Sequence, residues 1–200
     1  MKKVFRLVAV VAATVLAATA FVAPSATAAS KVKVGLAYDI GGRGDKSFND
    51  SAAAGLEAAK KKFGVTAKEI TVTQGTDSER EDKLRLLAKA GYNPIIAVGF
   101  LYAGPLKKVA SDYPNVQFGI IDDASVDLLN VAGLIFAEEQ GSYLAGVAAA
   151  LASKSGKVGY IGGVRIPLLQ KFEAGFVAGV KATKKSVTVD VKYVTEPPDF

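Results

Sequence analysis

The 200-residue chain contains no cysteine and no histidine. Without cysteine it can form no disulfide, thiolate nucleophile or thiolate metal site, and it offers no thiol for a lipid anchor. Without histidine it lacks the commonest general base and the commonest metal ligand. We therefore expect a protein that is not an enzyme, with no catalytic residues, no metal and no cofactor.

The first 28 residues have the order of a secretory signal peptide. A basic head is followed by an uncharged apolar run from Leu7 to Val22 and a small-x-small cleavage site at Ala26 to Ala28. A membrane anchor is the alternative, but the run is short and alanine-rich for a span. We expect cleavage after Ala28 and an exported, extracytoplasmic protein that, as written, is not lipid-anchored.

The basic charge is weaker than the formal net value of +6 indicates. Three of the cations lie in the signal peptide, which leaves 22 basic against 19 acidic residues, or +3. The remaining cations are scattered, and Lys60 to Lys62 suit the last turn of a helix, where positive charge is stabilised. No basic stripe is interleaved with aromatic residues, so we expect no nucleic-acid partner.

After the signal peptide, apolar strand patterns alternate with helical patterns. Strands are expected at residues 32–38, 70–73, 94–98, 116–121, 131–136, 158–161 and 187–194. Helices are expected at residues 47–63, 77–90, 105–112, 139–153 and 167–183, with capping boxes at Ser47/Asp50 and Thr76/Glu79. The alternation predicts an α/β fold with a mostly parallel sheet covered on both faces.

The pattern divides the mature chain into two unequal parts. Residues 29–136 carry enough elements for a complete N-terminal lobe that binds ligand. Residues 137–200 supply only two helices and two strands, which cannot form a closed core alone. We therefore expect them to be the incomplete start of a second lobe, and we expect this 200-residue chain by itself to bind ligand weakly or not at all.

The loop from Tyr38 to Asn49, YDIGGRGDKSFN, joins the first strand to the first helix, and ligands of open parallel sheets bind beyond such strand ends. It is not a phosphate-binding P-loop, because Asp45 stands where glycine must precede Lys-Ser. It is not a dinucleotide fingerprint either, since Ser47 takes the place of the third glycine. The tripeptide at residues 43–45 spells a cell-adhesion motif, which we attribute to chance.

The loop nevertheless carries three candidate ligand-binding residues. Asp39 suits hydroxyl or amino groups, Phe48 suits a planar ring, and Asn49 offers both a donor and an acceptor to a base edge. The alternative is structural: Asp39 and Asn49 would satisfy the turn backbone and Phe48 would pack inward. Spacing alone does not decide between these interpretations.

Two acidic pairs are further candidates. Asp122 or Asp123, directly after the fourth strand, reaches the same strand edge, although a solvated loop carboxylate is slightly favoured by position alone. Glu138 and Glu139 resemble a hydrolytic acid pair. Their place before an alanine-rich helix instead indicates a first helical turn, where negative charge is stabilised.

The spacing Asp-x-Gly-Gly-x-x-Asp-x-Ser-Phe-Asn, from Asp39 to Asn49, resembles the signature of the basic membrane protein (BMP) family of ABC transporter substrate-binding proteins, which includes bacterial purine nucleoside receptors. The resemblance continues through VGF at 98–100, FGIID at 118–122, EEQGSYLAG at 138–146 and segments within 157–182. No single motif is specific, but their order is, and together they cover residues 31–200.

The resemblance implies a type I periplasmic-binding-protein-like fold, in which two Rossmann-like parallel-sheet lobes joined by a hinge close on a ligand. We expect the second lobe to be truncated here. The resemblance also implies that Phe48 stacks on a nucleoside base, while Asp39, Asn49 and Asp122 hydrogen-bond its edge or nearby polar groups. The implied partners are a nucleoside and the permease subunits of an ABC importer, for a monomer peripheral to the membrane. Further ligand contacts are expected beyond Phe200.

Two other functions fit a similar architecture. A secreted nucleoside- or sugar-acting hydrolase would lack histidine, cysteine and a Gly-x-Ser-x-Gly elbow, which leaves it only acid chemistry. A sugar-binding type of repressor would need a DNA-binding head where the signal peptide stands. Retention of an uncleaved nucleoside would separate the receptor from the hydrolase.

Overall fold

The computed structural model describes residues 31–195. The predicted signal peptide and the C-terminal Pro-Pro-Asp-Phe lie outside the described residues. None of the helices between residues 31 and 195 combines the length and apolar character needed to cross a membrane.

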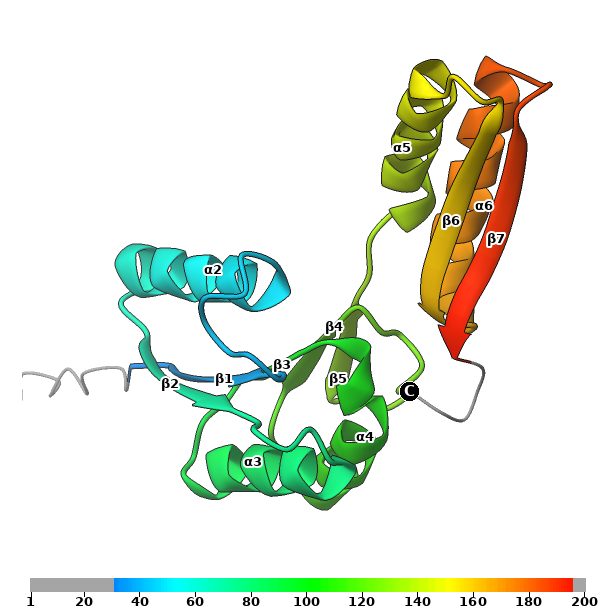
Figure 1. The fold of residues 1–200 in the computed structure, drawn as a ribbon. Helices are drawn as coiled ribbons and strands as arrows, with labels where there is room; N and C mark the ends of the chain where they lie inside the picture. Colours follow the sequence, from blue (N-terminus) through cyan, green and yellow to red (C-terminus); the bar gives the residue numbers. More distant parts are fainter. Residues whose placement is uncertain (1–30, 196–200) are drawn as a thin grey trace, which may run out of the picture. The chain divides into compact units, whose positions relative to one another are not determined.

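A five-stranded sheet organises the first part of the chain, and all four of its neighbouring pairs are parallel (Figure 1). Its order is β2-β1-β3-β4-β5. The strands are β1 (Lys33–Tyr38), β2 (Thr66–Thr71), β3 (Ile95–Val98), β4 (Phe118–Ile121) and β5 (Val131–Leu134). The chain runs outward from β1 to β2 and then returns to β3 on the other side. The order therefore reverses between β1 and β3, where open α/β sheets form a ligand crevice.

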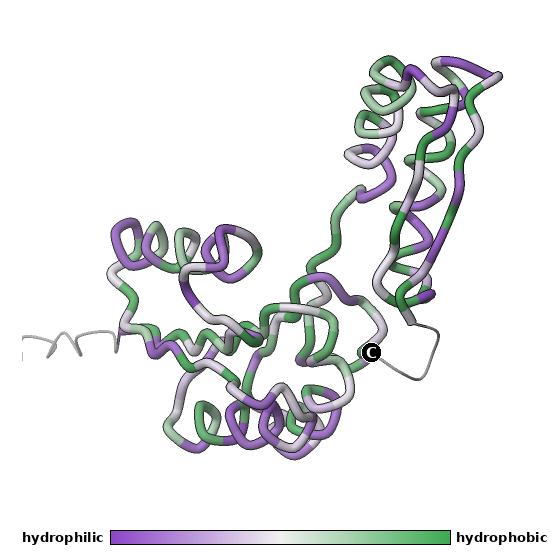
Figure 2. Tube along the Cα trace, in the orientation of Figure 1, coloured by the Kyte–Doolittle hydropathy of each residue, from purple (hydrophilic) through white to green (hydrophobic). Residues whose placement is uncertain are grey.

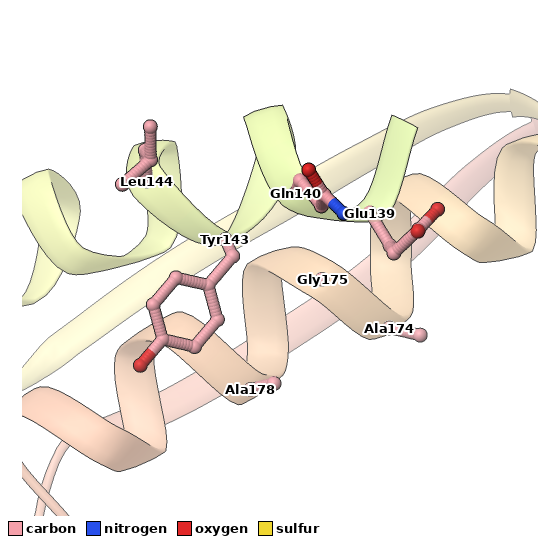
Figure 3. Close-up of a pocket in the computed structure, with 7 residues that line it drawn as sticks. All are labelled: Glu139, Gln140, Tyr143, Leu144, Ala174, Gly175 and Ala178. Atoms are coloured by element: carbon pink, nitrogen blue, oxygen red, sulfur yellow. The ribbon is translucent and has the colours of Figure 1, made fainter. Parts of the chain in front are cut away.

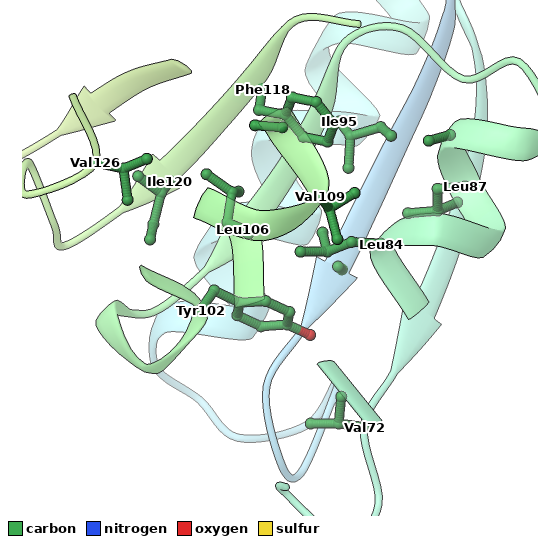
Figure 4. Packing of buried hydrophobic residues seen from close by; sticks show 14 residues of the cluster. Val72, Leu84, Leu87, Ile95, Tyr102, Leu106, Val109, Phe118, Ile120 and Val126 are labelled. Carbon is green, nitrogen blue, oxygen red and sulfur yellow. The ribbon is translucent and has the colours of Figure 1, made fainter. Parts of the chain in front are cut away.

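Helices cover both faces of this sheet, as the alternation predicts. Helix α2 (Phe48–Phe63) lies on one face, and α3 (Asp77–Lys89) and α4 (Ala103–Asp112) lie on the other (Figure 1). A short 3₁₀ turn, η1 (Phe100–Tyr102), leads from β3 into α4. Leu84, Leu106 and Ile120 are fully buried in the core between the sheet and α3 and α4 (Figure 4).

The predicted capping box at the start of α2 is wrong. Ser47 makes no side-chain capping hydrogen bond. The Asp45 carboxylate takes that role, because it accepts hydrogen bonds from the backbone N–H groups of Ser47, Asn49 and Asp50. The Asp50 carboxylate in turn accepts from Gly44 N at 2.7 Å and Lys46 N at 2.9 Å. The loop folds back on the helix start, a tertiary detail that the local S-x-x-D pattern does not contain.

Helix α3 begins as expected. Thr76 Oγ1 accepts a hydrogen bond from Glu79 N at 3.2 Å. The Glu79 carboxylate reaches further back than a standard capping box, to the N–H groups of Thr73, Gln74 and Gly75. Hydrogen bonds to those donors, led by Thr73, outweigh desolvation and lower the pKa of Glu79 to about 2. The turn before α3 is therefore fixed in place.

Strand β2 begins four residues earlier than predicted, at Thr66 rather than Ile70. Its first four residues, Thr-Ala-Lys-Glu, are not continuously apolar, as buried strands of a parallel sheet usually are. The sequence pattern therefore does not mark them as strand. Because β2 lies at the edge of the sheet and its residues are exposed or only half-buried, polar side chains are tolerated there.

The remaining elements are α5 (Glu138–Ala152), β6 (Lys157–Val164), α6 (Pro167–Thr183) and β7 (Thr188–Thr195). Strands β6 and β7 form a separate two-stranded parallel sheet. A small core of Ala150, Val180 and Val187 joins it to the helices. Beyond its first turn, α5 is hydrophobic around most of its circumference (Figure 2). Several of its apolar residues, including Leu144 and Leu151, are exposed.

Candidate ligand-binding site

The loop between β1 and α2 turns sharply and is held down by an ionic cluster. Gly42 has φ +56°, and a Cβ there would lie 2.8 Å from Thr71 Oγ1, so glycine is needed on both grounds. Arg43 donates to Glu69 Oε2 at 2.6 Å and to Glu57 Oε1 at 2.9 Å. The Tyr38 hydroxyl also donates to Glu69 Oε2, at 2.6 Å. These contacts hold the loop against Glu69 of β2 and Glu57 of α2.

These contacts perturb the ionisation of the cluster. The hydrogen bond from Arg43 outweighs desolvation and lowers the pKa of Glu69 to about 2. Burial, followed by the hydrogen bond to Glu69, raises the pKa of Tyr38 to about 12. Arg43 and Asp45 are both engaged within the protein, which agrees with treating the Arg-Gly-Asp tripeptide as chance.

The structure brings the four predicted binding residues together around one cavity of about 390 Å³. They stand at the carboxyl ends of β1 and β4 and at the start of α2. The lining consists of Asp39, Ile40, Asp45, Phe48, Asn49, Val98, Gly99, Phe100, Leu101 and Asp122. The end of β3 supplies Val98 and Gly99, so the cavity spans the point where the strand order reverses.

Asp39 has one carboxylate oxygen engaged inside the protein. Its Oδ1 accepts hydrogen bonds from Ile40 N at 2.8 Å and from Arg80 Nη2 at 2.9 Å. Its Oδ2 lies on the side of Gly99, where a Cβ would stand 3.6 Å from it. The alternative that Asp39 only satisfies groups of the protein therefore accounts for Oδ1. Oδ2 lies beside Gly99, which lines the cavity.

Phe48 and Asn49 differ in burial although they are neighbours. Phe48 does not pack inward, because 45% of it is exposed at the first residue of α2. Asn49 is only 4% exposed, and its Nδ2 makes a long, 3.4 Å hydrogen bond to Ile40 O. Asn49 Oδ1 is buried and has no hydrogen-bond partner. The exposed ring of Phe48 therefore lies next in the chain to a buried hydrogen-bond acceptor, Asn49 Oδ1.

Of the acidic pair after β4, it is Asp122 that lines the cavity. Asp122 has φ +74°, and its buried Oδ1 has no hydrogen-bond partner. Burial, reinforced by the nearby charges of Glu138 and Asp123, raises the pKa of Asp122. Asp123 instead caps its own turn, because its Oδ1 accepts from the N–H and hydroxyl of Ser125. Position in the sequence slightly favours a solvated loop carboxylate, and the structure instead places Asp122 on the cavity.

Glu138 and Glu139 open helix α5, as their first-turn assignment predicts. Glu138 is buried and accepts hydrogen bonds from Phe136 N and from Lys171 Nζ, each at 3.2 Å. Burial opposes ionisation of Glu138, but backbone N–H groups and Lys171 outweigh it and lower its pKa. These partners hold Glu138 in the first turn of α5.

A second cavity of about 450 Å³ adjoins the first and shares Phe48 and Asp122 with it. Its other lining residues include Phe136 and Glu138, together with Phe172 from α6. Phe172 has core spacing in the sequence, but it is only half-buried and lines this cavity instead.

A larger cavity of about 600 Å³ lies elsewhere, between α5 and α6, and none of the four predicted ligand-binding residues lines it (Figure 3). Tyr143 of α5 lies near Ala178 of α6, and Glu139 lies toward the other end of the cavity. A ligand site needs several convergent polar groups to orient its ligand. The lining here is mainly apolar, and the Tyr143 hydroxyl and Glu139 carboxylate lie toward opposite ends rather than converging. The smaller cavity at the strand ends therefore remains the candidate.

A residue in contact with the candidate site that the sequence did not reveal is Arg80. It is 3% exposed and lies on α3. It forms an ion pair with Asp39 at 2.9 Å and a longer one with the exposed Asp77 at 3.6 Å. Its position is 41 residues from Asp39 in the chain, and no local pattern links the two. Only the pairing of β1 with its neighbours brings them together.

Comparison with known proteins gives matches along the described chain. Residues 31–199 match the family model of PnrA-like ABC transporter substrate-binding proteins. The CD4+ T-cell-stimulating antigen of Listeria monocytogenes is 38% identical over 173 residues, which are 82% of this chain and 46% of the relative. The ABC transporter nucleoside-binding protein BmpA of Lactococcus lactis is 33% identical over 168 residues, covering 81% of this chain and 47% of the relative. The chain thus spans about half the length of these curated relatives.

Solved structures agree on the architecture. A solute-binding protein of an ABC transporter system from Aeropyrum pernix is similar with a TM-score of 0.70 and 33% identity. The similarity covers 82% of this chain and 47% of the other. The α/β fold with parallel sheets is therefore that of the periplasmic solute-binding proteins.

Proposed function

The chain belongs to the PnrA-like family of ABC transporter substrate-binding proteins, and from that membership we propose that the protein captures a neutral purine nucleoside for an ABC importer and leaves it chemically unchanged. The ligand would bind in a cleft between two lobes, with the cavity at the ends of β1, β3 and β4 as one wall. The name of the Lactococcus lactis relative, a nucleoside-binding protein, supports this choice of ligand.

The observation that carries the proposal is a set of unpaired acceptors. Among residues 31–195, the buried side-chain polar atoms without a hydrogen bond are Asn49 Oδ1, Asp122 Oδ1 and Arg80 Nε. Two of the three belong to predicted binding residues on one cavity. A buried polar group left unpaired costs roughly 1–3 kcal/mol. A ligand that presents N–H or O–H groups to Asn49 and Asp122 would recover that cost.

The charge of the cavity favours a neutral ligand over a phosphorylated one. Its lining contains three carboxylates, from Asp39, Asp45 and Asp122, and no basic side chain. A phosphate would meet like charge there, and like charges in a poorly solvated site repel strongly. A nucleoside offers donors on its base and ribose without a negative charge.

The exposed ring of Phe48 supplies the apolar part of recognition. Rings left 45% exposed at the mouth of a cavity are available to stack on a planar base. Stacking tolerates any base, so discrimination between bases falls to Asp39, Asn49 and Asp122. This division of roles is the one that the family resemblance implies.

The proposal extends to partners and location. We propose that the protein is exported, that it works as a monomer peripheral to the membrane, and that it delivers its ligand to ABC permease subunits. The signal-peptide pattern at residues 1–28 supports export.

Isothermal titration of the complete mature protein tests the function. We expect adenosine, guanosine or inosine to bind tightly. Ribose should bind at least tenfold more weakly because it has no base to stack on Phe48, and the matching 5′-monophosphates at least tenfold more weakly because of the acidic lining. Chromatography of the incubated nucleoside should show no free base, which separates a receptor from a hydrolase. A folded protein that binds none of the nucleosides, or that cleaves them, would remove the proposed function.

Replacing Asp122 by asparagine should separate stability from binding. Because the folded pKa of Asp122 is raised, ionising it costs stability at neutral pH, and that cost vanishes below its ordinary pKa. Asp122→Asn should therefore have a higher Tm than the parent at pH 7, with the difference disappearing near pH 3. Nucleoside affinity should nevertheless fall, because an ionised acceptor is lost. Thermal unfolding across pH measures the stability and titration with the nucleoside measures the affinity, with Asp127→Asn, at an exposed aspartate of the same loop, as the control. An unchanged affinity would argue against a binding role.

A further inference from the structure

Arg80 is a buried cation directly beneath the candidate site. It projects from α3 and is 3% exposed. Its Nη2 donates to Asp39 Oδ1 at 2.9 Å, and its Nη1 donates to the carbonyl of Gly75 at 2.6 Å. These two contacts link the end of β1 to the turn before α3.

The guanidinium is held from a third side by an aromatic ring. Its Cζ lies 5.8 Å from the centroid of the Tyr102 ring, a distance at which a cation is attracted to the ring face. Tyr102 is itself fully buried in the core cluster (Figure 4). Its hydroxyl donates to the backbone carbonyl of Tyr38 at 2.8 Å, one residue before Asp39. Arg80 and Tyr102 thus brace the chain on both sides of the point where β1 ends.

A contribution to stability alone does not explain the buried ion pair between Arg80 and Asp39. Burying an ion pair often gains little over a well-packed apolar side chain, because two charges lose their hydration. Arg80 Nε is also buried without a hydrogen bond, which adds a further penalty. The paired carboxylate, by contrast, gains a fixed orientation: with Oδ1 docked on Arg80 and Ile40 N, Oδ2 is turned toward Gly99 at the cavity.

We propose that Arg80 is a positioning residue for ligand recognition, which docks one oxygen of Asp39 and thereby aims the other into the cavity as a hydrogen-bond acceptor. Arg80 does not line the cavity and acts only through Asp39. The proposal rests on the proposed function in treating Asp39 as a ligand-binding residue. The orientation of the Asp39 carboxylate is independent of any ligand.

Variants of the complete mature protein test this role. Arg80→Met removes the cation and keeps much of the volume, whereas Arg80→Lys keeps the charge but cannot donate to Asp39 and Gly75 in a fork. Arg85→Met is the matched control, because Arg85 lies on the same helix, in ion pairs with Glu81 and Asp112 away from the cavity. We expect Arg80→Met to weaken binding of guanosine, adenosine or inosine roughly tenfold, the coupling typical of contacting residues. Arg80→Lys should recover part of the affinity, and Arg85→Met should change none of it.

A double-mutant cycle with Asp39→Asn separates positioning from general loss of structure. If Arg80 acts through Asp39, its replacement should weaken binding little further once Asp39 is already asparagine. Additive losses in Kd would overturn the proposal. Where Arg80→Met does not fold, the same cycle run with Arg80→Lys decides.

A ligand-free crystal structure of Arg80→Met, or of Arg80→Lys, provides the second readout. The Asp39 carboxylate should leave its place beside Gly99; an unchanged carboxylate would overturn the proposal even if binding fell. If the parent protein binds no nucleoside, the proposed function fails, while this structure still decides whether Arg80 positions Asp39.

Discussion

Replacing Phe48 by alanine is expected to weaken nucleoside binding by about 5- to 150-fold, with little loss of stability. Base–aromatic stacking contributes about 1–3 kcal/mol per base, and each 1.4 kcal/mol is a factor of ten in Kd. Stability should change little because the ring is 45% exposed and belongs to none of the core clusters. Titration with the nucleoside that the parent protein binds, beside a thermal melt, measures both effects.

The same helix provides the control for this experiment. Phe63 is the last residue of α2, is 68% exposed, and lies at the opposite end of the helix from the cavity. Phe63→Ala removes an equal ring from the same element and should leave Kd unchanged. Phe48→Tyr keeps a stacking face and should retain most of the affinity. Equal affinity of Phe48→Ala and the parent protein would remove the stacking role while leaving the fold assignment intact.

Replacing Gly179 by alanine is expected to destabilise the packing of α5 on α6 by about 1–3 kcal/mol, the usual cost of overpacking a close contact. A Cβ at Gly179 would collide with the backbone carbonyl of Tyr143 on α5. Gly175 and Gly146 meet the facing helix backbone in the same way, at Glu139 and Phe176. Three glycines therefore let the two helices approach more closely than any side chain permits. A Tm lowered by about 2–4 °C per kcal/mol would report the loss.

Gly141 supplies the opposite expectation on the same helix. It also lies in α5, but a Cβ there would meet nothing within 4 Å. Gly141→Ala should therefore raise stability by about 0.8–1.0 kcal/mol, the difference in helix propensity between the two residues. If Gly179→Ala and Gly141→Ala behaved alike in thermal unfolding of the complete mature protein, the close contact between the helices would be refuted.

The two halves of the described chain thus use different packing. The N-terminal part buries leucine, isoleucine and tyrosine side chains between a five-stranded sheet and its helices. The part from Glu138 onward brings helix backbones together at glycines and leaves apolar side chains such as Leu144 and Ile161 exposed. The expectation that residues 137–200 are the incomplete start of a second lobe stays a prediction.

Much of the fold was predictable because its signals are local. Apolar strand patterns indicated most strands, helical spacing indicated each α-helix, and Thr76 with Glu79 marked the start of α3. The α/β class and the family resemblance are both confirmed. Two predictions were wrong: β2 begins in a polar stretch that the edge of the sheet tolerates, and Asp45 takes the capping role that we assigned to Ser47.

The sequence by itself determined the order of strands and helices, and it indicated Asp39, Phe48, Asn49 and Asp122 as the residues at the strand ends. Only the tertiary structure decided that the four share one cavity, that Asp122 rather than Asp123 lines it, and that Arg80 holds Asp39. The physical reason is the separation along the chain over which each signal acts. Periodicity and capping act over a few residues, whereas the contact from Arg80 to Asp39 spans 41 residues and exists only because parallel strands place their carboxyl ends side by side.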